Sequence, residues 1–174
     1  MSSIQNFRSC GIFLFKIENN ELKLLLLKSS ANSSLPYHRS ICKGLRSPID
    51  MNDLDNAQRE TLEEAHQNIF DYDILDIETL TYEYDLYRQG VLCKKSVTGF
   101  FALKKTDTPI ILSDEHISYE WVSRSRLGQL FEVELQDFLL TAYQTAFERF
   151  ENYYINNLAD RLSAEKMIIQ HFNN

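Results

Sequence analysis

Arg59-Glu60-Thr61-Leu62-Glu63-Glu64-Ala65 is the stretch of this chain that says most about its fold and its chemistry. On a helix, Glu60, Glu63 and Glu64 lie at positions i, i+3 and i+4, so three carboxylates share one face. Like charges at this spacing repel each other and weaken an isolated helix. Carboxylate oxygens are the ligands that Mg²⁺ or Mn²⁺ prefers, and both ions serve phosphate chemistry. The stretch therefore predicts a helix that holds divalent cations.

The composition is that of a folded protein with an acidic surface. Of the 174 residues, 44% are hydrophobic and 12% are aromatic, which is enough for a hydrophobic core. The length favours one domain, assigned to residues 1–150, followed by a helical extension at 151–174. The formal net charge of -7 argues against a broad surface for duplex DNA. It is compatible with a small anionic substrate bound through metal ions.

The cysteines and the apolar segments indicate the compartment. Cys10, Cys42 and Cys93 are far apart in the sequence and form no metal-ligand pattern, so we expect free thiols in a reducing environment. The first residues lack the charged and then apolar layout of a signal peptide. No apolar run is long enough to span a bilayer. These features predict a soluble, cytoplasmic protein without a membrane partner.

Strands and helices alternate in the predicted plan of the chain. Alternating apolar positions at Leu80, Tyr82, Tyr84 and Leu86 are typical of a strand with one buried face. The patterns predict a hairpin of strands 9–16 and 22–27 turning at Asn19-Asn20, an irregular loop 37–55, a helix from 53–56 to about 68, strands 74–87, 92–104 and 120–122, and helices 127–150 and 157–170. This order of hairpin, loop, helix, hairpin, strand and helix indicates the α/β class.

The segment around the acidic helix resembles the Nudix box, the signature motif of the Nudix hydrolase family. The residues that match are Gly44, Arg59, Glu60, Glu63 and Glu64. Asp50 stands where the family has Glu, and the spacer from Asp50 to Arg59 is one residue longer. His66 replaces the closing glycine, so we expect His66 or Asn68 to adopt the positive φ that ends the helix.

Within this family, the chain is similar to the asymmetrical diadenosine tetraphosphate hydrolases. The similarity is carried by three segments, 9–12, 43–44 with 59–65, and 112–121, where Leu-Ser-Asp-Glu-His precedes Tyr119 and Trp121. It extends from about residue 9 to residue 130. The resemblance implies a Nudix-fold α/β/α sandwich with a mixed sheet. The C-terminal helix has no counterpart in it and is expected to be an addition.

The resemblance also implies roles for the charged residues. Glu60 and Glu64 would be direct ligands of Mg²⁺ or Mn²⁺, with the carbonyl of Gly44 completing the set. Glu63 would add a further carboxylate to the metal site and to catalysis. Glu115, from another loop, would ligate a metal or accept a proton from the attacking water.

Other residues are implied to position the site and to bind substrate. Arg59 would form an ion pair with Asp50 and so hold the helix against the loop. The residues expected to contact substrate are Lys43, Tyr87, Lys95 and His116. On the residues alone, a solvated hairpin end is the more ordinary interpretation of Lys95, and cross-strand packing is the more ordinary interpretation of Tyr87.

Three functions are compatible with these features. The first is a Mg²⁺-dependent pyrophosphohydrolase that cleaves a phosphoanhydride bond of a nucleoside polyphosphate, with diadenosine tetraphosphate, split into ATP and AMP, as first choice. The second removes pyrophosphate from the 5′ end of RNA. The third is a protein that kept the fold, lost turnover, and binds a nucleotide or a partner. The extra helix, with apolar residues from Leu158 to Phe172, could pack on the domain or form a homodimer, so monomer and homodimer both remain open.

Overall fold

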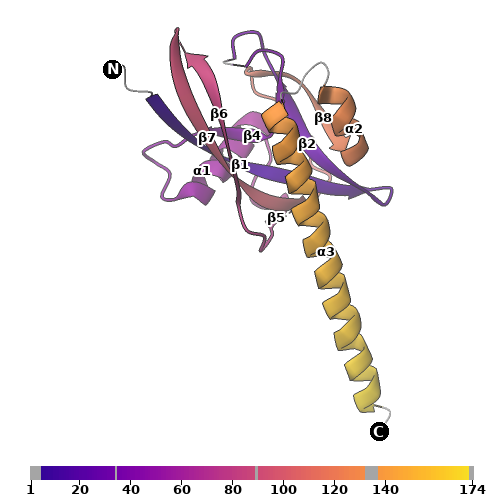
Figure 1. Cartoon of the computed structure of the whole chain (residues 1–174). Coiled ribbons are helices and arrows are strands. Elements are labelled where there is room, and N and C mark those ends of the chain that lie inside the picture. Colours follow the sequence, from indigo (N-terminus) through magenta and orange to yellow (C-terminus); the bar gives the residue numbers. More distant parts are fainter. Residues whose placement is uncertain (1–4, 34, 89, 132–136, 173–174) are drawn as a thin grey trace.

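The computed structural model describes residues 5–33, 35–88, 90–131 and 137–172, and these form a mixed β-sheet with helices on both faces (Figure 1). The strands are β1 (Gln5–Glu18), β2 (Glu21–Ser29), β3 (Arg39–Ser40), β4 (Cys42–Leu45), β5 (Tyr72–Ile74), β6 (Leu80–Arg88), β7 (Val91–Lys104) and β8 (His116–Ser123); the helices are α1 (Asp53–Ala65), α2 (Arg124–Phe131) and α3 (Asp137–Phe172). β1 and β7 run parallel, and the other described pairs are antiparallel. The predicted α/β/α sandwich is confirmed.

The β1–β2 hairpin forms as the sequence predicts. Glu18 pairs with Glu21 across a two-residue turn. Both turn residues, Asn19 and Asn20, have positive φ angles of 53° and 61°, which asparagine tolerates better than most residues. The run Leu24–Leu27 is buried on both faces of the sheet, which explains its continuous apolar character.

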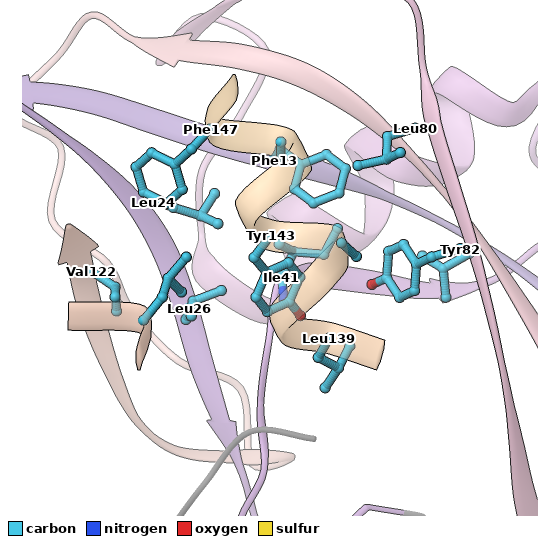
Figure 2. Packing of buried hydrophobic residues seen from close by; sticks show 14 of the residues in the cluster. Phe13, Leu24, Leu26, Ile41, Leu80, Tyr82, Val122, Leu139, Tyr143 and Phe147 are labelled. Carbon is cyan, nitrogen blue, oxygen red and sulfur yellow. The ribbon is translucent and has the colours of Figure 1, made fainter. Parts of the chain in front are cut away.

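The alternation of side chains along β1 divides the core into two layers. Phe13 and Phe15 point to the face covered by α2 and α3, and Ile12 and Leu14 point to the face covered by α1. Figure 2 shows part of the first layer, where Phe13, Leu24, Leu26, Leu80, Tyr82, Leu139 and Tyr143 gather between the sheet and α3. The predicted inward face of β6 is confirmed, since Leu80, Tyr82, Tyr84 and Leu86 all belong to this layer.

Two predictions of local structure were wrong. The segment 37–55 is not wholly irregular, because β3 and β4 within it pair with β2 and β1; strands of two and four residues are too short to show an alternating pattern. The two helices predicted at 127–150 and 157–170 are instead α2 and one continuous α3. No glycine or proline interrupts 137–172, so nothing in the sequence ends that helix early.

The far half of α3 extends beyond the sheet (Figure 1). Tyr154, Ile155 and Leu158 are exposed there. The predicted apolar surface farther along, from Leu162 to Phe172, involves side chains outside the described part of the structure. No helix in the described residues combines the length and apolarity needed to cross a bilayer.

Candidate active site

A cavity of about 690 Å³ lies where β4, the acidic face of α1, the start of β8 and the loop after β2 meet. Its described lining is Ser29, Ser30, Asn32, Ser33, Ser40, Lys43, Gly44, Leu45, Glu60, Glu63, Glu64, Lys95, Asp114, Glu115 and His116. Leu45 is the one apolar side chain among them. A space of this size and polarity suits a charged small molecule.

Local signals fix the two ends of α1. The side chain of Asn52 accepts a hydrogen bond from the Asp55 N–H at 2.9 Å, so the helix is capped one residue before the predicted range. At the other end, His66 has a φ of 56° and its N–H donates to the carbonyl of Leu62. His66 therefore adopts the left-handed conformation that ends the helix, at the position where the family motif has glycine. It is one of the two residues expected to do so.

Arg59 connects α1 to the loop that follows β4. Its Nε and Nη2 donate to the two carboxylate oxygens of Asp50 at 2.9 and 3.1 Å, and Nη2 also donates to the carbonyl of Leu45 at 3.0 Å. This two-point hydrogen bond holds the pKa of Asp50 below its usual range. The predicted Arg59–Asp50 pair is confirmed. The shorter Asp reaches the guanidinium, and its Oδ2 also accepts the N–H of Ser47 at 2.6 Å.

Glu60 lies directly against the backbone of Gly44. A Cβ atom added to Gly44 would stand 2.1 Å from the carboxylate of Glu60, so only glycine leaves room for it. Arg59 Nη1 is 2.8 Å from Glu60 Oε1 and also 2.8 Å from Glu63 Oε2. Burial raises the pKa of Glu60, and the nearby Arg59 opposes that shift.

Glu64 is the most buried of the three helix carboxylates, with 7% of the residue exposed. Its Oε2 accepts the backbone N–H of Lys43 at 2.8 Å, which joins α1 to β4. Its Oε1 lies 3.9 Å from Nε2 of His116. Burial raises the pKa of Glu64 to about 8; Lys43 opposes this shift, and the charges of Glu60 and Glu115 add to it.

The end of α1 holds the loop that brings Glu115 and His116 to the cavity. The N–H of Ser113 donates to the carbonyl of Glu64 at 3.2 Å, and the N–H of Ile111 donates to that of Ala65 at 3.3 Å. His116 is largely buried, and burial lowers its pKa to about 4, with Lys43 adding to the shift. Its imidazole is therefore neutral near pH 7 and can act as donor or acceptor without adding a positive charge.

The donor set of this cavity fits a hard divalent cation. Glu60, Glu63, Glu64 and Glu115 offer only carboxylate oxygens. As the side chains stand, no group of three acidic, histidine or cysteine side chains in the described residues is arranged to hold an ion; Glu60 and Glu63 are turned toward Arg59. Burial of Glu60 and Glu64 near one another disfavours their charged forms, and a bound cation would stabilise those charged forms, so the residues suit Mg²⁺ or Mn²⁺.

The structure brings together three of the four residues expected to bind substrate. Lys43, Lys95 and His116 line the cavity. Tyr87 does not line it, because it alternates with the inward-facing residues of β6 and is 71% exposed on the other side of the strand. Tyr84, three residues earlier, lies opposite Lys95 in the β6–β7 ladder.

A polar wall of the cavity was missed at the sequence level. It consists of Ser29, Ser30, Asn32, Ser33, Ser40 and Asp114. The N–H of Ser30 donates to the carbonyl of Glu115 at 2.9 Å, so this wall and the Glu115 loop are joined. Small polar residues between two strands indicate a loop but not what the loop contacts.

Comparisons with known proteins agree with this geometry. No family model matches the chain. It is 32% identical over 136 residues to the asymmetrical bis(5′-nucleosyl)-tetraphosphatase of Rattus norvegicus, covering 73% of this chain and 86% of that protein. Among solved structures it is similar to a C. elegans Ap4A hydrolase binary complex, with a TM-score of 0.70, 21% identity, and coverage of 86% of this chain and 98% of that one.

A second solved structure has the same fold at lower identity. It is a Nudix hydrolase from M. smegmatis, RenU, with a TM-score of 0.65, 14% identity, and coverage of 86% of this chain and 89% of that one. Together with the rat relative and the acidic helix at the cavity, this likeness shows that the chain belongs to the Nudix hydrolase family.

Proposed function

We propose that this Nudix hydrolase is a Mg²⁺-dependent pyrophosphohydrolase that splits diadenosine tetraphosphate into ATP and AMP. The observation that carries the proposal is the pair of carboxylates formed by the partly buried Glu60 and the buried Glu64, in a polar cavity that Lys43, Lys95 and His116 also line. The name of the rat relative supports the choice of substrate.

A divalent ion would be held by Glu60 and Glu64, with Glu63, Glu115 and the Gly44 carbonyl as further ligands. When bound, it supplies charge neutralisation and polarises phosphoryl oxygens. The side chains of the protein would supply the rest of the catalytic effect. Phosphoryl transfer depends mainly on positioning and on electrostatic stabilisation of the charged oxygens.

Substrate recognition in this cavity is expected to act on the phosphate chain and the sugars. Lys43 and Lys95 supply positive charge, and the serines of the polar wall supply hydroxyl groups. Among the described lining residues there is no aromatic ring on which a base could stack. We therefore expect the adenine rings to contribute less to binding than the phosphates.

The proton of the attacking water would go to Glu115. This residue is exposed on a loop that is fixed to both Ser30 and the end of α1, so it combines access to water with a defined position. Glu63 is held by Arg59 and is the second candidate. Arg59 itself is a positioning residue in this scheme, because its guanidinium is occupied by Asp50 and Leu45.

The domain division expected from the sequence is also proposed. Among the described side chains of α3, Phe150 is the last that packs in the core, and Tyr154 and Ile155 beyond it are exposed. Residues 1–150 would then form the catalytic domain and 151–174 an extension. A chain that ends at residue 158 should keep the kcat of the full chain.

The test is to incubate the protein and Mg²⁺ with diadenosine tetraphosphate, with 5′-triphosphorylated RNA, and with ATP, and to compare kcat/KM. We expect the dinucleotide to be preferred and Glu64→Gln to lower its kcat by about 100-fold or more. Glu148→Gln is the matched control and should have no effect, because it removes only an exposed ion pair between Glu148 of α3 and Arg124 of α2. A preference for RNA would favour the 5′-pyrophosphohydrolase alternative. A folded protein that binds all three and cleaves none would favour a binding role.

A further inference from the structure

A buried backbone N–H next to the active site finds its partner on the C-terminal helix. Ile41 lies between β3 and β4 and is fully buried. Its N–H donates to the hydroxyl oxygen of Tyr143, at an N···O distance of 3.3 Å. Tyr143, also fully buried, is 102 residues farther along the chain, on α3. Figure 2 shows the two residues together in the core beneath α3.

Ile41 begins the segment that positions the acidic residues. Two residues later, the N–H of Lys43 holds Glu64, and next to it Gly44 makes room for Glu60. The strand pairs fix Ser40 to Leu27 and Cys42 to Ile12, but Ile41 itself lies between the two ladders. The hydroxyl of Tyr143 therefore supplies the hydrogen bond that the sheet does not.

We propose that Tyr143 is a positioning residue for the active site and that it connects α3 to the segment 41–44. A buried N–H without a partner costs roughly 1–3 kcal/mol, so the backbone shifts or admits water when the acceptor is removed. Any shift at Ile41 is passed along two residues to Lys43 and Gly44. The carboxylates of Glu60 and Glu64 then lose their relative placement, while the core keeps its aromatic ring.

Tyr82 offers a matched control in the same core. Its ring lies edge-on to that of Tyr143, with ring centres 6.4 Å apart. Its hydroxyl is also buried and interacts electrostatically with that of Tyr143, but within the described residues it makes no hydrogen bond of regular geometry and none to the backbone of 41–44. Tyr82→Phe and Tyr143→Phe thus remove the same atom from the same layer, and only the second breaks a bond to the 41–44 segment.

The experiment measures kinetics and hydrogen exchange for both variants of the full chain. For Tyr143→Phe we expect kcat to fall about 3- to 10-fold, less than the roughly 100-fold loss that a full 1 Å misplacement can cause. We expect KM to stay within about twofold, because Lys95 and His116 lie on β7 and β8, outside the segment 41–44, and Lys43 is the one substrate-binding side chain that moves with it. Amide exchange of the peptide that contains 41–44 should accelerate. Tyr82→Phe should leave kcat, KM and this exchange unchanged.

Two results would overturn the inference. One is a Tyr143→Phe protein with unchanged kcat and unchanged exchange at 41–44, whatever its melting temperature. The other is an equal effect of Tyr82→Phe, which would mean that any lost hydroxyl in this layer disturbs the site. The kinetic part rests on the proposed function, and the exchange part does not. If the wild type cleaves no polyphosphate, the function fails, and the exchange of 41–44 in the two variants still decides the role of Tyr143.

Discussion

Gly44→Ala should lower the activity of this protein strongly and its stability only slightly. The backbone of Gly44 is outside the left-handed region, so alanine is allowed there by its dihedral angles. The difficulty is space: the new Cβ would lie 2.1 Å from Cδ and from Oε2 of Glu60 and 2.3 Å from Oε1. An ordinary contact begins at 3.4 Å. The carboxylate must therefore move by more than about 1 Å.

The size of each effect follows from what has to move. The carboxylate is the end of a rotatable side chain and can turn away from the new methyl group. The free energy of unfolding should therefore fall by about 1 kcal/mol or less, which corresponds to roughly 2–4 °C in Tm for a domain of this size. Misplacement of a reacting or metal-binding group by about 1 Å can cost about 100-fold in rate. We therefore expect kcat to fall by about 100-fold in a protein that remains folded.

The assay is kcat over a range of Mg²⁺ concentrations, together with thermal unfolding by circular dichroism. Gly128→Ala is the matched control, because a Cβ at Gly128 would have no atom of the described residues within 4 Å. It lies in α2, where alanine favours the helix over glycine by roughly 0.5–1 kcal/mol, so stability should rise slightly and activity should not change.

A Gly44→Ala variant that keeps more than half of the wild-type kcat with the same Mg²⁺ requirement would contradict this prediction. A variant that loses activity only because it unfolds would contradict it as well. Either result would mean that the contact between Gly44 and Glu60 does not set the geometry of the site.

Three further predictions concern the rest of the molecule. Phe15→Ala should lower the free energy of unfolding by about 3–5 kcal/mol in urea titration, because this buried ring lies 5.1 Å from the ring of Phe147 and 4.7 Å from that of Phe150. Ile17→Ala, at an exposed position of the same strand, should lower it by less than about 0.5 kcal/mol. Equal losses in the two variants would contradict this packing. Asp50→Ala should lower kcat about tenfold by releasing Arg59 from its two-point contact, whereas Asp50→Glu should keep most of the activity; an active Asp50→Ala variant would show that the loop needs no such anchor. Hydrogen bonds from the hydroxyls of Thr108 and Thr106 hold the pKa of Asp71 below its usual value. The ionised Asp71 therefore stabilises the folded protein fully above the unfolded pKa of about 3.9, and this contribution is lost as the pH falls through the lower pKa of the folded state. The difference in unfolding free energy between wild type and Asp71→Asn should therefore be large at about pH 6 and small near pH 2–3, and a difference that does not vary with pH would contradict the assignment.

Several parts of the fold were predictable because their signals are local. The Asn19-Asn20 turn, the continuous Leu run of β2 and the inward face of β6 each lie within a few consecutive residues. The helix α1 carried its own cap and its own row of carboxylates. The Arg59–Asp50 pair also followed from a motif, although the spacer is longer than usual.

The missed features depend on residues that are distant in sequence. Tyr87 is an exception, because its outward side follows locally from alternation with the inward-facing Leu86. The polar wall of the cavity is near the carboxylates because the Glu115 loop is anchored both to Ser30 and to α1. The bond from Ile41 to Tyr143 crosses 102 residues and leaves no local pattern. The unbroken α3 is different, since the absence of glycine and proline from 137 to 172 was visible in the sequence.

The central claim is that the acidic face of α1 directs asymmetric hydrolysis of a nucleoside polyphosphate. The most direct test is to quantify the products of diadenosine tetraphosphate over time with saturating Mg²⁺. We expect ATP and AMP to appear in equal amounts from the first time point, and to be nearly absent with Glu64→Gln. Formation of ADP alone, or an unchanged rate with Glu64→Gln, would contradict it.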